Sequence, residues 1–173
     1  VQVWRFGAYY LFLFGGFVAL SLTLKNYYEN VYDVSPTKAG ALVCLFALLS
    51  AGFRAVGGWM SDKYGARAVM YGVLISCILS CATLSVAVPF MVFVILSCFV
   101  GTVMGIGMAA VYKHIPVYFP KEVPVVGAMV GVIGGLGGFI LPNAFKQLLQ
   151  STVSEQYPNG NFATSWMVLT AIS

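Results

Sequence analysis

Apolar stretches of about 20 residues recur along the whole chain, and they constrain its fold more than any other feature. A helix needs about 20 apolar residues to cross the ~30 Å hydrocarbon core of a bilayer. Of the 173 residues, 60% are apolar and only 8% are charged, whereas an ordinary soluble domain is roughly a quarter charged. The sequence therefore predicts an all-α membrane protein and excludes a soluble enzyme.

Dividing the length by about 27 residues per span and loop gives about six spans. They are expected at residues 6–24, 39–60, 69–88, 90–112, 125–145 and 162–173. A polar loop is expected at 25–36, a compact loop at 61–67, and an interfacial extension of the fourth span up to residue 120. Pro142 is expected to kink or end the fifth helix, because proline removes a backbone donor.

The chain ends suggest a piece of a longer polypeptide. Val1 is not followed by a basic n-region or a cleavage site, and Ser173 lies inside the sixth apolar run, where a targeting segment or a complete span would look different. The last helix is therefore expected to be cut short.

The few charged and sulfur-containing residues exclude several classes of partner. Nine Lys or Arg against five Asp or Glu give a net charge of +4, but no basic run follows a phosphate backbone, so nucleic acid is not an expected partner. The cysteines lie in apolar runs without a CxxC pair or nearby His and carboxylate ligands. They are interpreted as packing residues, and neither a metal nor a cofactor is expected; they are Cys44, Cys77, Cys81 and Cys98.

Arg54 is the most informative single residue, since it lies inside the second expected span roughly 10 Å from Asp62 at about 1.5 Å per residue. A charge there costs at least about 2.5 kcal/mol, so Arg54 is expected to face a bundle interior or a water-filled cavity. Its fork of donors suits a planar oxyanion. The alternative is a structural arginine paired with carbonyls or an acid, but no acidic residue lies deep in a span. A substrate anion is therefore favoured.

Glycine, aromatic and lysine residues supply further candidates. Glycines 127, 131, 134, 135 and 138 are expected on one face of the fifth helix, where they either pack helices closely or let helices slide and an anion approach the backbone. Tyr10 and Phe14 are one turn apart and share a face; in isolation both look like core residues. Lys113 is expected near the membrane interface, where a lysine side chain can snorkel.

Residues 58–67 match the pattern G-x-x-x-D-[RK]-x-G-x-[RK], which resembles the loop motif of the major facilitator superfamily. The matching residues are Gly58, Asp62, Lys63, Gly65 and Arg67. The chain departs from the pattern at Ala68, where the superfamily often has a second basic residue. The resemblance implies a loop on the cytoplasmic side, in which Asp62 and Arg67 stabilise one state of a gate.

The glycine-rich runs 105–120 and 127–142 resemble the nitrate/nitrite porter family of that superfamily. The resemblance covers nearly the whole chain and implies its C-terminal half, helices seven to twelve. It also implies that Arg54 holds the anion and that Tyr10 and Phe14 flank it. Gly131 and Gly134 are expected beside the anion, although Met108 and Gly131 stand where many relatives have Asn or Ser.

The expected function is transport of nitrate or nitrite across the cell membrane by rocking of two six-helix halves. The partners are the small anion, the lipid bilayer and the missing N-terminal half. Exchange needs no titrating group, whereas proton symport needs one, and Lys113 is the candidate in this chain. A transporter of another small anion, or a membrane sensor or scaffold that binds an anion without moving it, remains an alternative. An enzyme is not expected, because no nucleophile is accompanied by a base or a cofactor motif.

Overall fold

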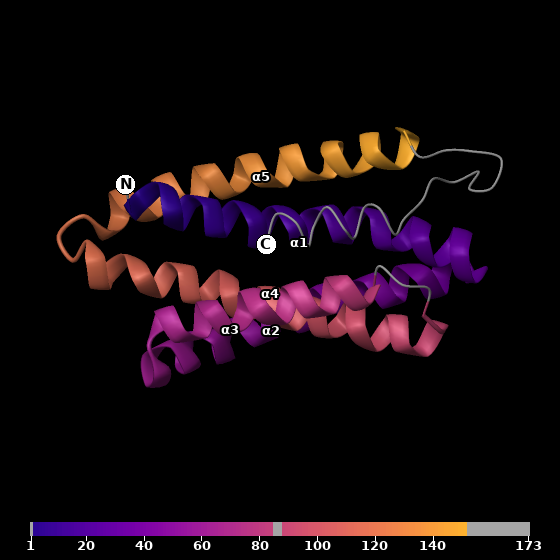
Figure 1. Cartoon of the computed structure of the whole chain (residues 1–173), viewed down its shortest axis with the longest axis horizontal. Coiled ribbons are helices and arrows are strands. Elements are labelled where there is room, and N and C mark those ends of the chain that lie inside the picture. The colour runs from indigo at the N-terminus through magenta and orange to yellow at the C-terminus, as the bar shows by residue number, and fades with distance from the viewer. Residues whose placement is uncertain (1, 85–87, 152–173) are drawn as a thin grey trace.

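Five long helices make up the computed structural model, which describes residues 2–84 and 88–151 (Figure 1). They are α1 (Gln2–Tyr32), α2 (Pro36–Tyr64), α3 (Ala66–Leu84), α4 (Phe90–Tyr118) and α5 (Val123–Ser151). Each of the five is long and apolar enough to cross a membrane. The all-α membrane fold is thereby confirmed; the expected span 162–173 lies outside the described residues.

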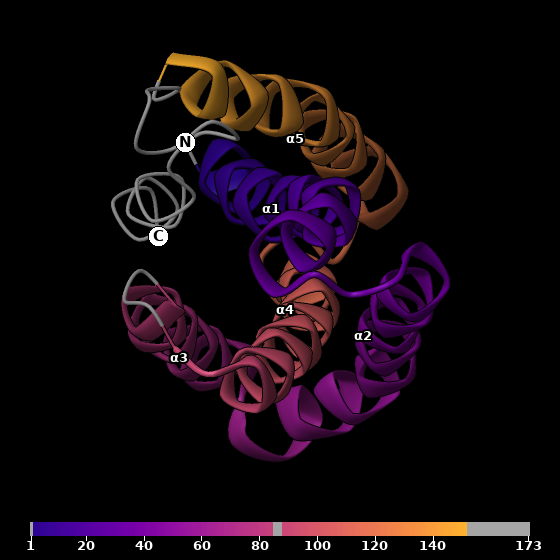
Figure 2. The same ribbon diagram turned by 90° about the vertical axis from the view of Figure 1, so that its right-hand side faces the viewer.

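The helices run alternately up and down, and α4 lies at the centre of the bundle. Viewed along the helices, α2 and α3 flank α4, and α1 separates α4 from much of α5 (Figure 2). The most extensive contacts join α1 to α5 and α2 to α4, and α3 packs mainly against α4. The starts of α1, α3 and α5 and the ends of α2 and α4 therefore meet at one end of the bundle, which we call the motif end because it carries residues 58–67.

The expected polar loop at 25–36 is wrong over most of its length, because α1 continues to Tyr32. At about 1.5 Å per residue its 31 residues measure about 46 Å, well beyond the hydrocarbon core. The extension is held by α4: the Tyr28 hydroxyl is 2.9 Å from the Ser97 hydroxyl, and the Tyr32 hydroxyl donates to the Val88 carbonyl at 2.7 Å. Asp33, with φ of 50°, then reverses the backbone.

The compact loop expected at 61–67 is wrong in extent as well, since only Gly65 lies outside the helices there. Its φ of 86° is a backbone conformation that residues other than glycine rarely adopt. Its N–H donates to the Ser61 carbonyl at 3.1 Å and so closes α2. A single glycine therefore makes the whole corner between α2 and α3.

Prolines do not end helices here. Pro142 lies inside α5, which continues to Ser151, so the expectation of a helix end is not met. Pro116 lies inside α4, and the interfacial extension of that span is itself helical to Tyr118. Membrane helices tolerate proline because neighbouring groups satisfy the freed carbonyls.

Glycines set the closest helix contacts. A Cβ on Gly105 of α4 would lie 2.2 Å from the Ser50 carbonyl oxygen of α2, and one on Gly57 of α2 would lie 2.6 Å from the Ile106 backbone. Gly15 of α1 and Gly137 of α5 approach each other in the same way, with 2.6 Å from a Gly15 Cβ to the Gly137 carbonyl carbon. At these positions the absence of a side chain lets the helix backbones approach closely, as in other small-residue helix contacts.

Candidate functional site

Arg54 projects from the middle of α2 and is exposed at the surface of this five-helix body. The described helices leave this part of α2 open, so the expectation that Arg54 faces a bundle interior or a water-filled cavity stays a prediction. Ser50 and Gly57, one turn away on the same face of α2, pack against α4. The Arg54 Nη2 donates to the Met108 sulfur of α4 at 3.0 Å. A thioether is a weak acceptor, and a guanidinium carries five N–H donors.

No carboxylate of the described residues lies within ion-pair distance of Arg54; the pairs found there are Lys25–Glu29 and Lys113–Asp62. None of the acids in the described bundle therefore neutralises Arg54, so the described residues do not show a structural arginine paired with an acid. Most of the donors of Arg54 remain available on a face that the described helices leave open.

Tyr10 and Phe14 of α1 form the second part of the site. Their rings are stacked, with 5.6 Å between centroids and 8° between planes. Tyr10 is buried, at 9% exposed, and interacts electrostatically with both Arg54 and Tyr112. The structure thus brings Tyr10 together with Arg54, although the two lie on different helices.

Tyr112 of α4 is a residue that the sequence analysis passed over. Its ring meets that of Tyr10 edge-on, with 5.1 Å between centroids and 81° between planes, and 41% of Tyr112 is exposed. It stands one turn beyond Met108, on the same face of α4. That spacing was the one signal available, but a tyrosine near a helix end also fits an ordinary interfacial tyrosine.

The glycine face of α5 receives these aromatic rings. A Cβ on Gly134 would lie 2.0 Å from Cδ1 of Tyr10, and one on Gly131 would lie 3.3 Å from the Tyr112 hydroxyl. A Cβ on Gly138 would lie 3.3 Å from the Phe14 ring. Gly135, expected on this face, meets nothing within 4 Å. The contact face is therefore rotated from the predicted one and includes Gly137 in place of Gly135.

Four helices thus contribute to one candidate anion site. It combines a guanidinium, two phenol groups and a flat aromatic ring, and no carboxylate of the described residues is paired with the guanidinium. Among the described residues no group of three or more His, Cys, Asp or Glu is placed to hold a metal ion. The chemistry that the site offers is electrostatic and hydrogen-bonding recognition of a small planar anion.

The charged residues of the loop motif bind the last turns of α4. Lys113 Nζ lies 2.7 Å and 2.8 Å from the two carboxylate oxygens of Asp62, and the Arg67 guanidinium donates to the Tyr118 hydroxyl. Lys63 instead lies over the rings of Trp59 and Tyr64, 5.2 Å from each centroid. Two contacts therefore fasten the α2–α3 corner to α4: the Asp62–Lys113 ion pair and the Arg67–Tyr118 hydrogen bond.

Neutralising Asp62 is expected to weaken this fastening without unfolding the protein. The side chains of Lys113 and Asp62 are 43% and 62% exposed, so the pair contributes at most about 1 kcal/mol. That energy corresponds to a shift of about fivefold or less between two states. We expect Asp62→Asn to lower the protection of the backbone amides at the α2–α3 corner against hydrogen exchange by up to that factor, and the exchanged pair Asp62→Lys with Lys113→Asp to recover part of it.

Lys63→Gln is the matched control, because Lys63 belongs to the same motif but contacts only aromatic rings. Hydrogen exchange of the backbone amides around Gly65 in the full-length protein provides the measurement. Equal losses in the Lys63 and Asp62 variants would contradict a specific role for the ion pair.

The fold defines a multi-pass helical membrane protein, and Arg54 with its neighbours forms a candidate anion site on the open face of that protein. The profile of the Major Facilitator Superfamily matches residues 1–145, and the chain belongs to this superfamily. The resemblance seen in the sequence is confirmed, and the protein is placed in the cell membrane.

The curated relatives share one theme. The chain is 37% identical to the probable nitrate/nitrite antiporter NarK1 of Thermus thermophilus, over 99% of this chain and 44% of that protein. It is 29% identical to the nitrite extrusion protein of Bacillus subtilis, over 99% of the chain and 42% of the relative. It is also 29% identical to the probable nitrate transporter NarT of Staphylococcus epidermidis, over 82% and 36%. The chain therefore spans less than half the length of these relatives.

Proposed function

We propose that this chain is the C-terminal half of a transporter that moves nitrate and nitrite across the cell membrane by alternating access. The observation that carries the proposal is the exposed Arg54 guanidinium, which interacts electrostatically with Tyr10, on a face that the described helices leave open. Tyr112 meets the Tyr10 ring edge-on. The names of the relatives support nitrate and nitrite as the anions of this proposal. A second six-helix half would close this face and complete the site.

In this proposal Arg54 binds two oxygens of the anion, Tyr10 and Tyr112 donate hydrogen bonds, and the Phe14 ring packs against the flat face of the anion. Gly131 and Gly134 have no side chain, so they leave room for the rings of Tyr112 and Tyr10. They also leave the α5 backbone close to the anion. The corner at Gly58, Asp62, Gly65 and Arg67 holds one state of the gate. No step needs a nucleophile, so we propose a transporter rather than an enzyme.

The coupling of transport follows from the same contacts. Lys113 is held by Asp62 and is 43% exposed at the motif end, so its ammonium is already neutralised by a carboxylate. Exchange of nitrate for nitrite needs no titrating group, and we propose exchange as the mode that these residues support. Proton symport would need Lys113 to release Asp62 during the cycle.

The decisive experiment uses the full-length transporter in liposomes loaded with nitrite and challenged with external nitrate. Nitrite efflux that depends on external nitrate and stays level from pH 6 to 8 supports exchange. Flux that rises as the external pH falls would replace exchange by symport. Binding of nitrate without flux, in a properly inserted protein, would overturn the transporter in favour of an anion sensor.

Tyr112→Phe tests the residue that the structure adds to the site. A hydrogen bond to a charged group contributes about 1.5–3 kcal/mol, so its loss is expected to raise the KM for nitrate about tenfold or more. The ring and its contact with Tyr10 stay in place. Tyr64→Phe, at an exposed position of the motif end, is the matched control, and an unchanged KM in both variants would remove Tyr112 from the site.

A further inference from the structure

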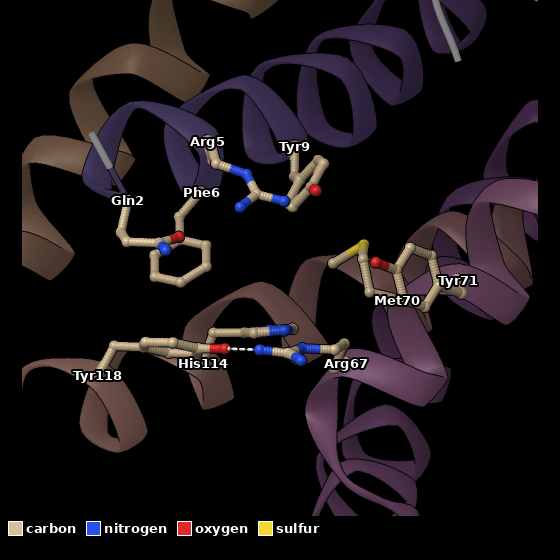
Figure 3. A pocket seen from close by; sticks show the side chains of 9 residues that line it. All are labelled: Gln2, Arg5, Phe6, Tyr9, Arg67, Met70, Tyr71, His114 and Tyr118. Atoms are coloured by element: carbon tan, nitrogen blue, oxygen red, sulfur yellow. Dashed lines mark hydrogen bonds between the residues drawn. The ribbon is translucent and has the colours of Figure 1, made fainter.

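A cavity of about 180 Å³ opens at the motif end of the bundle, between the starts of α1 and α3 and the end of α4 (Figure 3). Arg54, Tyr10 and Tyr112 do not line it, so it is separate from the candidate anion site. It has room for a phosphate group with some water, since one water occupies about 30 Å³ in the liquid.

The charges around the cavity are all of one sign. Arg5 of α1 points into it from one side and Arg67 of α3 from the other (Figure 3), and none of the described residues that line it is acidic. Gln2, Tyr9 and Tyr71 add polar groups. Two guanidinium groups facing one small space without a carboxylate favour an anion with several oxygens.

Packing around His114 holds the wall of the cavity in shape. His114 lines the cavity and is only 6% exposed. Its Nδ1 donates to the Ala110 carbonyl at 2.9 Å. Its ring forms a three-ring cluster with Phe6 and Tyr118, with centroids 5.2 Å and 6.3 Å from its own and 5.4 Å from each other. Tyr118 in turn accepts a hydrogen bond from Arg67. The cavity is therefore bounded by ordered side chains of three helices.

The position of the cavity along the helices indicates which kind of molecule supplies the anionic group. Arg5 lies in the first turn of α1, Arg67 begins α3 and Tyr118 ends α4. Trp4 and Tyr71 are exposed nearby, at 69% and 55%, as aromatic residues are at the boundary between hydrocarbon and water. The phosphates of the lipid headgroups lie at this level, and basic pockets between membrane helices suit anionic headgroups.

We propose that this cavity binds the phosphate group of an anionic phospholipid, with Arg5 and Arg67 as its charge partners. Arg67 also belongs to the loop motif, so a bound lipid joins α1 to the α2–α3 corner. The site lies beyond the transport function proposed above and does not depend on which anion is carried.

The test measures lipid retention by native mass spectrometry of the full-length protein in a neutral detergent. The probes are phosphatidylglycerol, phosphatidylcholine and inorganic phosphate. We expect phosphatidylglycerol to bind more tightly than phosphatidylcholine, and Arg5→Gln to weaken phosphatidylglycerol binding about tenfold, as the loss of a charge-assisted contact implies. Arg5 is exposed in the first turn of α1, so this variant should fold; the melting temperature checks that it does.

Lys38→Gln, which removes one exposed charge at the opposite end of the bundle, is the matched control and should bind phosphatidylglycerol like the parent. Equal phosphatidylglycerol binding by the parent and by Arg5→Gln would overturn the proposal, as would an equal loss in the Lys38 variant. Displacement of the lipid by low millimolar inorganic phosphate would reassign the cavity to a soluble phosphate and overturn the lipid as its source.

Discussion

Arg54→Lys is expected to abolish most nitrate transport while the protein still inserts and folds. Lysine keeps the positive charge but offers a point charge in place of two parallel donors, so at least one charge-assisted hydrogen bond to the anion is lost. Such a bond contributes about 1.5–3 kcal/mol, which corresponds to a loss of roughly tenfold to more than a hundredfold. Nitrate-driven nitrite efflux from liposomes is the measurement.

Two features of the structure make this substitution informative. Arg54 is exposed, donates a side-chain hydrogen bond to the Met108 sulfur and has no ion pair with an acid of the described residues, so replacing it leaves no buried acid without a partner. Lys38→Arg, an exchange between the same two cations at another exposed position, should transport normally. Near-normal flux in Arg54→Lys, with equal amounts of protein in the membrane, would remove the anion-binding role of Arg54.

The sequence predicted the helices well and their ends poorly, for a physical reason. The bilayer dictates the length of an apolar run, so the first five expected spans fall inside the observed helices or overlap them; the sixth lies outside the described residues. Helix ends beyond the hydrocarbon are decided by tertiary contacts instead. α1 continues through Tyr28 and Tyr32 because their hydroxyls bond to residues more than 50 positions away. The Tyr28 hydroxyl bonds to the Ser97 hydroxyl, and the Tyr32 hydroxyl donates to the Val88 carbonyl.

The sequence predicted those residues of the candidate anion site whose chemistry conflicts with the apolar residues around them. Arg54 stood out because a charge in an apolar span is costly, whereas Tyr10 and Phe14 were raised above ordinary core residues only by the family resemblance. Tyr112 and Met108 conflict with nothing locally. Their role comes from α4 lying between α1 and α2, which no local pattern encodes.

The rotated glycine face has a similar origin. Five glycines at nearly helical spacing define a broad stripe, and which edge of the stripe meets α1 depends on how α5 is turned. The close approach of Gly15 and Gly137 sets that turn. Gly135 then faces open space while Gly134 faces Tyr10. Two adjacent glycines of one stripe therefore have different surroundings, and substitutions can separate them.

Gly134→Ala is accordingly expected to reduce transport about fivefold or more, and Gly135→Ala to leave it unchanged. A Cβ at position 134 would lie 2.0 Å from Cδ1 of Tyr10, so either α5 or the Tyr10 ring must move. Overpacking of this kind costs about 1–3 kcal/mol, and the movement takes the Tyr10 hydroxyl away from Arg54. Efflux assays and melting temperatures on both variants measure the two effects.

The paired design separates packing from helix propensity. Both substitutions make the same chemical change one residue apart, and alanine favours a helix over glycine at either position. A loss confined to Gly134→Ala therefore assigns the effect to the Tyr10 contact. If the two variants transport equally well, α5 does not lie against α1 at this point in the working transporter, and the site must be assembled without the Tyr10–Gly134 contact.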